Sequence, residues 1–148
     1  MEAIFEVVRI RQEIREAKEE FASYKITSPM DAEKLAAFYI ADEDREVFLV
    51  MMLNTKNEVI GLHRSSVGSL NASIVHPREV MKAAILNNAA SIIVSHQHPS
   101  GDPTPSREDI EVTRRINEAG KTMGIQLLDH IIVTHKGSYV SLKEKGHI

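Results

Sequence analysis

The chain has no cysteine among its 148 residues. Disulfide bonds and thiolate chemistry are therefore excluded, and the composition is compatible with a reducing compartment. Long apolar runs are also missing, because the longest, Val47–Leu53, falls far short of the ~20 residues that span a bilayer. The N-terminus does not have the basic and then apolar order of a signal peptide. We therefore expect a cytoplasmic protein with no membrane partner.

Excess positive charge is missing as well. The net charge is -3 and the isoelectric point is near 6.2, whereas a general nucleic-acid-binding surface is usually basic. Arg114, Arg115 and Lys121 form only a modest basic strip, and no aromatic residues alternate with them to stack on bases. Hydrophobic content of 43% and charged content of 26% are instead typical of one soluble globular domain.

The order of apolar and polar segments predicts an α/β fold. Residues 1–25 are expected to be an N-terminal amphipathic helix, with the helical pattern running from residue 3 to about 22. Residues 26–148 are expected to form the folded domain. Its predicted helices begin at Ser28–Pro29, at Pro77 and after Ser106, and its predicted strands are Val47–Leu53, Val59–Ser66, Ser91–Ser95, Leu127–Val133 and Tyr139–Leu142. This alternation indicates a three-layer α/β/α sandwich around a mixed central sheet.

The most informative segment follows the predicted strand at Ser91–Ser95. His96 and His98 lie two residues apart at the end of that strand, so both imidazoles can point to one position. A loop rich in proline and glycine comes next, and Ser106 then has the features of a helix N-cap, with Asp109 in the first turn. Two imidazoles and one carboxylate make a three-ligand zinc site that leaves a fourth position for water. We therefore predict one Zn²⁺ per chain.

This segment resembles the JAMM (MPN-type) metalloproteases, whose pattern is H-x-H, seven residues, then S-x-x-D. The neighbouring sequence is most similar to the RadC-type JAB domain, and the resemblance runs from about Ile26 to about Thr134. It implies a cytidine-deaminase-like fold. The chain departs from the pattern at Gln97, where the family usually has Asn at a position that points away from the metal. The 148 residues also do not include the helix-hairpin-helix region of longer RadC proteins.

The resemblance also implies two catalytic residues. Glu46, placed directly before a buried strand, aligns with the family's general acid/base. Ser106 aligns with the residue that hydrogen-bonds the developing oxyanion, although an N-cap hydroxyl that faces helix amides is less free for this role. Glu46 also belongs to an acidic run, and such a run is usually a solvated face.

Other interpretations of the same residues stay open. Asp109 has the spacing of a capping-box partner of Ser106, independently of any metal. Asp129 and His130 are either a second acid/base pair or structural groups near the site. The remaining histidines are expected to be ordinary surface or core residues; they are His63, His76, His135 and His147.

Together these patterns predict a zinc-dependent hydrolase that cleaves a peptide or isopeptide bond. Its substrate is a peptide or protein whose identity these residues do not specify, and the oligomeric state is equally unspecified. Two alternatives remain. One is a nucleic-acid-associated factor, because the family carries a DNA-repair name. The other is a non-catalytic, metal-binding interaction module.

Overall fold

Strand β1 (Val47–Leu53) is an inner strand of the sheet, and each of its seven residues is buried. The computed structural model describes residues 3–68 and 75–148. The other strands are β2 (Val59–Val67), β3 (Ser91–Gln97), β4 (Gln126–Val133) and β5 (Tyr139–Ser141). The α-helices are α1 (Pro29–Ile40), α2 (Pro77–Leu86) and α3 (Arg107–Met123), and η1 (Glu19–Phe21) is a single 3-10 turn.

The sheet is mixed, with the strand order β2-β1-β3-β4-β5. Strand β1 is antiparallel to both β2 and β3, whereas β3 and β4 are parallel. The parallel pair is connected through α3, as parallel neighbours require a crossover. Residues 98–106 connect the C-terminal end of β3 to the N-terminus of α3.

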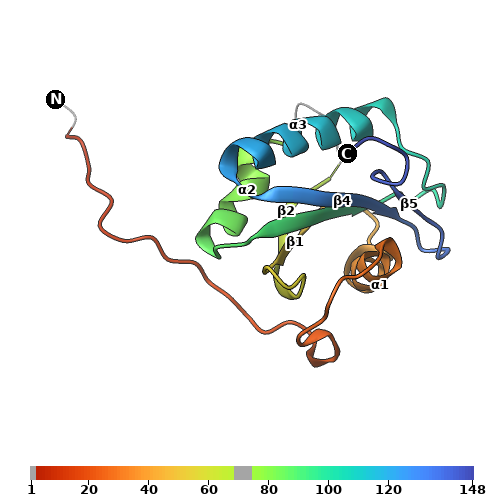
Figure 1. Cartoon of the computed structure of the whole chain (residues 1–148), viewed down its shortest axis with the longest axis horizontal. Coiled ribbons are helices and arrows are strands. Elements are labelled where there is room, and N and C mark those ends of the chain that lie inside the picture. Colours follow the sequence, from red (N-terminus) through yellow and green to blue (C-terminus); the bar gives the residue numbers. More distant parts are fainter. Residues whose placement is uncertain (1–2, 69–74) are drawn as a thin grey trace.

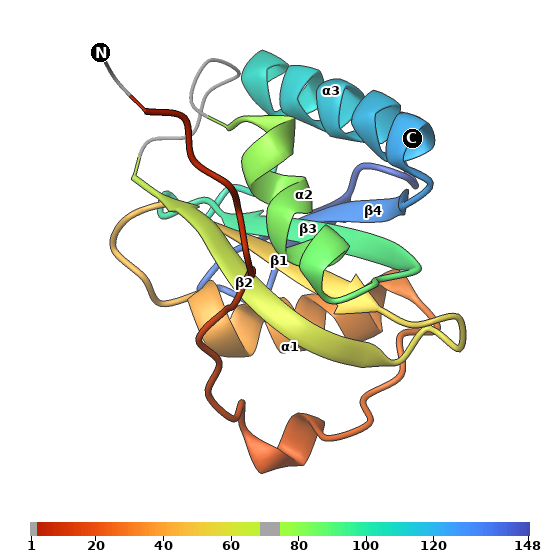
Figure 2. The ribbon, with the colours of Figure 1, turned by 90° about the vertical axis from the view of Figure 1, so that its left-hand side faces the viewer.

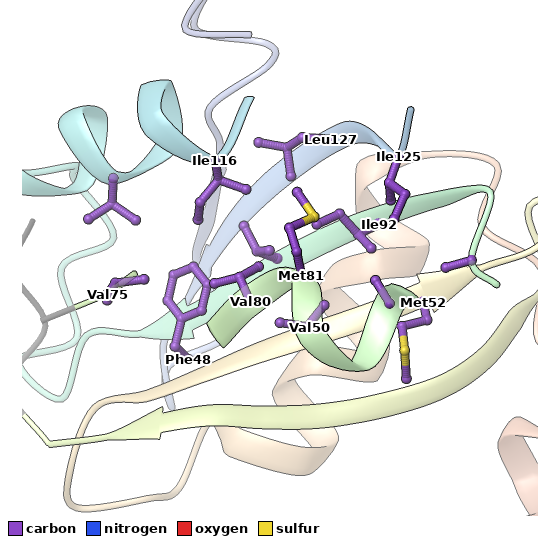
Figure 3. Close-up of a cluster of buried hydrophobic side chains, with 14 residues drawn as sticks. Phe48, Val50, Met52, Val75, Val80, Met81, Ile92, Ile116, Ile125 and Leu127 are labelled. Atoms are coloured by element: carbon purple, nitrogen blue, oxygen red, sulfur yellow. The ribbon is translucent and has the colours of Figure 1, made fainter. Parts of the chain in front are cut away.

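Helices cover both faces of the sheet (Figures 1 and 2). Helix α1 packs on one face through Leu35 and Ile40, against β1 residues such as Leu49. Helices α2 and α3 pack on the other face, where Phe48 and Ile116 belong to the second core cluster (Figure 3). Burial on both faces explains why β1 has a continuous apolar sequence rather than an alternating one. The predicted arrangement of helices on both sides of a mixed sheet is therefore what the structure has.

Local sequence signals set the ends of the helices. Proline occupies the first turn of α1 and α2, at Pro29 and Pro77, where its missing N–H costs no helical hydrogen bond. Helix α3 begins with a capping box and ends at Gly124, whose φ of 71° is left-handed. These boundaries agree with the predicted ones within a few residues.

The predicted N-terminal helix is wrong for the residues that the structure describes. Residues 3–18 form no regular secondary structure and are exposed, and only η1 follows them before the domain. Figure 1 shows this segment running away from the sheet. An isolated helix of this length is marginal in water, because most helical stability comes from packing an apolar face on a partner surface. Residues 1 and 2 of the predicted helix, and 69–74 of the loop after β2, lie outside the described residues.

Among the described residues, no helix has the length and apolar content needed to cross a membrane.

Candidate metal centre

Three side chains meet where β3 ends and α3 begins. The Nε2 atoms of His96 and His98 are 3.1 Å apart. The Asp109 carboxylate faces both rings, with Oδ1 at 3.1 Å from His96 Nε2 and Oδ2 at 3.1 Å from His98 Nε2. These residues form a cluster that could hold a metal ion. The structure thus brings together the three residues that the sequence predicts as ligands.

The loop between β3 and α3 holds His98 in place. The backbone N–H of His98 donates to the carbonyl of Val133 at 3.0 Å, and its ring Nδ1 lies 2.8 Å from the carbonyl oxygen of Asp102. Because a carbonyl only accepts, Nδ1 carries a hydrogen, and in the neutral ring the lone pair is therefore on Nε2. Gly101 turns the loop with a φ of 89°, and a Cβ there would lie 2.7 Å from Lys136 Cε.

Asp109 is held by the N-terminus of α3. Its backbone N–H donates to Ser106 Oγ at 3.0 Å, while its own Oδ2 accepts from the Ser106 backbone N–H at 2.8 Å. Asp109 therefore takes part in the capping box and also faces both histidines. Its interpretation as a capping residue and its interpretation as a metal ligand do not exclude each other. The helix N-terminus also favours the ionised carboxylate.

Electrostatics at this point favour positive charge. Burial acts to raise the pKa of Asp109, but hydrogen bonds from His96 and His98 outweigh it and hold that pKa well below its ordinary value. The hydrogen bond to Asp109 raises the pKa of His98, and the charge of Glu46 acts in the same direction. A buried carboxylate that stays ionised is a suitable partner for a cation.

The donor set fits a zinc ion. Ligands about 2.0–2.1 Å from a tetrahedral zinc are about 3.3 Å apart, which is close to the 3.1 Å separations of the nitrogen and oxygen atoms here. Two imidazoles and one carboxylate are also the ligand types of catalytic rather than structural zinc sites, which usually have four ligands. His96 and Asp109 are buried, whereas the side chain of His98 is 16% exposed, so the cluster reaches the surface at His98.

Ser106 contacts this centre directly, whereas Glu46 acts on it through its charge. Glu46 is half-buried directly before β1, and its carbonyl accepts from the Gly68 backbone N–H at 2.8 Å. Its charge contributes to the raised pKa of His98, which places it in the electrostatic neighbourhood of the cluster. Ser106 is exposed, and its hydroxyl oxygen accepts the Asp109 N–H. That bond uses an oxygen lone pair, so the hydroxyl hydrogen remains available to another acceptor.

Gln97 points away from the cluster, as predicted. Its side-chain Oε1 accepts from the Val47 backbone N–H at 2.8 Å, and its Nε2 donates to the carbonyls of Glu43 and Arg45. One fully buried amide therefore holds the segment that carries Glu46. Sequence reasoning did not find this connection, because the two segments are about 50 residues apart in the chain.

Asp129 and His130 have different surroundings. Asp129 Oδ2 accepts from Ser141 Oγ at 2.7 Å, and Oδ1 accepts from the backbone N–H groups of His130 and Lys143. Burial raises its pKa. Asp129 thus ties β4 to the C-terminal segment.

His130 instead lies behind the metal cluster. It is fully buried, and its Nε2 is 2.8 Å from His96 Nδ1. Its other ring nitrogen, Nδ1, is 2.6 Å from Thr113 Oγ1. The role of Thr113 escaped sequence reasoning. The available signal was its position four residues after Asp109, on the same face of α3.

The chain is closely similar to proteins of one family. Residues 26–147 match the RadC-like JAB domain. The chain is 54% identical over 125 residues to a UPF0758 protein of Caldanaerobacter subterraneus subsp. tengcongensis, an alignment that covers 84% of this chain and 53% of that protein. It is 47% identical over 147 residues to a UPF0758 protein of Methanosarcina mazei, which covers 99% of this chain and 62% of that one. This sequence therefore spans little more than half the length of these relatives, and it belongs to the RadC-like JAB domain family.

Proposed function

We propose that this domain is a zinc-dependent hydrolase of amide bonds, either peptide or isopeptide. The observation that carries the proposal is the convergence of two imidazole nitrogens and one ionised carboxylate beside a partly exposed His98. Among the residues that the structure describes, this group has three members, whereas a closed structural site usually has four protein ligands. Membership of the JAB family supports the same conclusion.

Zinc in this position would lower the pKa of a bound water and polarise the substrate carbonyl. In the proposed reaction, Glu46 accepts a proton from the attacking water and later delivers it to the departing amine. Glu46 is half-buried directly before β1 and its charge acts on His98, which suits a carboxylate that must exchange protons with groups near the metal.

Ser106 has the complementary role in this proposal. Its hydroxyl hydrogen, which the capping interaction leaves available, donates to the oxygen that becomes negative as the carbonyl is attacked. The capping box holds this hydroxyl at the N-cap of α3, next to the candidate ligand Asp109.

The test is the variant Glu46→Gln, which keeps the shape of the side chain and removes its basicity. We expect it to retain about one zinc per chain and to hydrolyse substrate about 10²–10⁴-fold more slowly than the parent protein. Metal content is measured by elemental analysis, and turnover is measured on a panel of fluorogenic peptides and lysine-linked isopeptides. Asp44→Asn is the matched control, because it makes the same chemical change at an exposed position of the same segment.

Two results would contradict the proposal. Turnover by Glu46→Gln at the parental rate would remove Glu46 from the mechanism. Zinc-loaded parent protein that hydrolyses no member of the panel would favour a non-catalytic metal-binding module instead.

A further inference from the structure

A chain of buried polar contacts runs behind the candidate metal centre. It begins at His96 Nδ1, which is 2.8 Å from His130 Nε2, and continues from His130 Nδ1 to Thr113 Oγ1 at 2.6 Å. Thr113 Oγ1 then donates to the backbone carbonyl of Asp109 at 2.8 Å. The side chains of these residues are excluded from water, with relative exposures of 1% for His96 and 0% for both His130 and Thr113.

With both imidazole rings neutral, one placement of hydrogens makes every contact in this chain attractive. The Asp109 carbonyl has no hydrogen to give, so the single hydroxyl hydrogen of Thr113 is donated to it. Thr113 Oγ1 must then accept a hydrogen from His130 Nδ1. The neutral His130 ring has its lone pair on Nε2, which accepts the hydrogen of His96 Nδ1.

The same placement determines which nitrogen of His96 can bind a metal. With its hydrogen on Nδ1, the neutral His96 ring has a lone pair on Nε2, the atom that faces His98 Nε2 and Asp109 Oδ1. The opposite placement, which the Asp109 carboxylate favours, would put a hydrogen on Nε2 and block that nitrogen as a ligand. The position of the Thr113 hydrogen, one helical turn beyond Asp109, thus decides the chemistry at His96.

We propose that Thr113 and His130 are positioning residues, which fix the tautomer and the orientation of His96 so that its Nε2 lone pair points into the metal centre. The relay also connects two ligands, since it begins at His96 and ends at the backbone of Asp109. Phe48 closes it from the side, stacked on the ring of His96 and edge-on to that of His130. This inference rests on the metal centre of the proposed function and concerns residues that touch neither metal nor substrate.

The first test is the zinc affinity of relay variants, measured by competition with a chromophoric chelator. Thr113→Val keeps the shape of the side chain and removes the hydroxyl, and His130→Leu removes both ring nitrogens. We expect zinc binding about 10–100-fold weaker in each, the usual effect of losing a group that orients a ligand histidine. Thr113→Ser restores the hydroxyl and should return the affinity to within about threefold of the parent.

Ser95→Ala is the matched control for a simple packing defect. Ser95 is also fully buried, and its hydroxyl donates to the Ile131 carbonyl at 2.6 Å, between the same two strands but outside the relay. The variant Ser95→Ala should bind zinc with the affinity of the parent, even if its unfolding temperature falls as much as that of Thr113→Val. Equal affinities in Thr113→Val, Ser95→Ala and the parent would overturn the proposal.

A second measurement separates the relay from the function of the site. Long-range ¹H–¹⁵N correlation spectra of the metal-free protein at alkaline pH report which nitrogen of the His96 ring carries the hydrogen. We expect Nδ1 to carry it in the parent and in Thr113→Ser, and a mixture of both tautomers in Thr113→Val. If His96 has the same tautomer in all three proteins, the relay does not select it. Failure of the parent to bind zinc, with this tautomer pattern intact, would refute the proposed function and leave the relay standing.

Discussion

The carboxylate of Asp109 belongs to two structures at once. Its Oδ2 accepts the Ser106 backbone N–H and faces His98, while Oδ1 faces His96. Removing this side chain therefore disturbs the helix cap as well as the metal ligands. For this reason, loss of stability in an Asp109 variant says little about metal binding, and the two effects must be measured separately.

The metal-free protein should have a stability that depends on pH through this cluster. The pKa of His98 is raised above its ordinary 6.5, so its contribution is fully present below 6.5 and is lost as pH rises through the raised value. The pKa of Asp109 is lowered from 3.8, so its contribution is present above 3.8 and is lost as pH falls through the lowered value. Denaturant unfolding of the metal-free protein should show the largest contribution of the cluster between these two limits.

Zinc should reverse the alkaline part of this dependence. A ligand histidine must be neutral, so zinc competes with the proton on His98, and the stabilisation due to zinc should grow as pH rises through the raised pKa. The measurement is the unfolding free energy with and without saturating zinc across the neutral range. His98→Gln is the control, and an unchanged pH dependence in that variant would assign the effect to another group.

Asp129 provides a second prediction at this scale. Asp129→Ala leaves three buried or half-buried donors without their acceptor, namely Ser141 Oγ and the backbone N–H groups of His130 and Lys143. We expect the unfolding free energy to fall by about 1–3 kcal/mol, with zinc affinity close to that of the parent. Chemical denaturation and chelator competition measure the two quantities. A large loss of zinc affinity in folded Asp129→Ala would show that Asp129 contributes to the metal centre.

At the scale of helices and strands, sequence reasoning worked where local pattern and burial agree. The apolar run of β1, the strand before His96 and the capping box of α3 are all properties of short segments, and the structure has each of them. The ligand set was predictable for the same reason, because it lies within one strand–loop–helix segment. Contacts between distant segments were not predictable: nothing in the sequence pairs Gln97 with the start of β1, or Thr113 with His130.

The connection made by Gln97 leads to a prediction about β1. Gln97→Met has a similar length but no polar atoms, and it leaves the Val47 N–H and two carbonyls without their partner. We expect a loss of about 1–3 kcal/mol in unfolding free energy and faster hydrogen exchange at the Val47 amide, with zinc affinity unchanged.

Gln126→Met is the control for this substitution, because Gln126 is exposed at the start of β4. It should leave both stability and exchange at Val47 unchanged. Exchange at Val47 that is equally slow in Gln97→Met and the parent would show that other contacts hold the segment before β1.

On the scale of the whole molecule, the folded domain begins just before the residues that match the family. The ring of Phe21 packs against Tyr24, Phe38 and Tyr39, and the family match begins at Ile26. The exposed segment before η1 makes side-chain contact with the domain through Gln12 and Asn87. Its apolar residues are exposed, which explains why the amphipathic pattern there did not produce a packed helix.

A variant without residues 1–17 should therefore remain as stable as the parent. We expect its unfolding free energy to change by less than about 1 kcal/mol, because the deletion removes few buried groups, and its zinc affinity to be unchanged. A variant without residues 1–22 also loses Phe21 from the aromatic cluster, and should lose at least about 1 kcal/mol. Denaturant unfolding compares them, and a large loss in the shorter deletion would mean that the segment contributes to the folded core.

The unequal exposure of the three candidate ligands has a kinetic consequence. His96 and Asp109 are buried, whereas His98 is partly exposed. His98 is held by two hydrogen bonds, from its ring to the Asp102 carbonyl and from its backbone N–H to the Val133 carbonyl. Release of a bound ion would then begin with a movement of His98 and its loop. This local opening requires much less free energy than global unfolding. Exchange with an external chelator should accordingly be much faster than global unfolding, and a substitution that loosens the loop at Gly101 should accelerate it further.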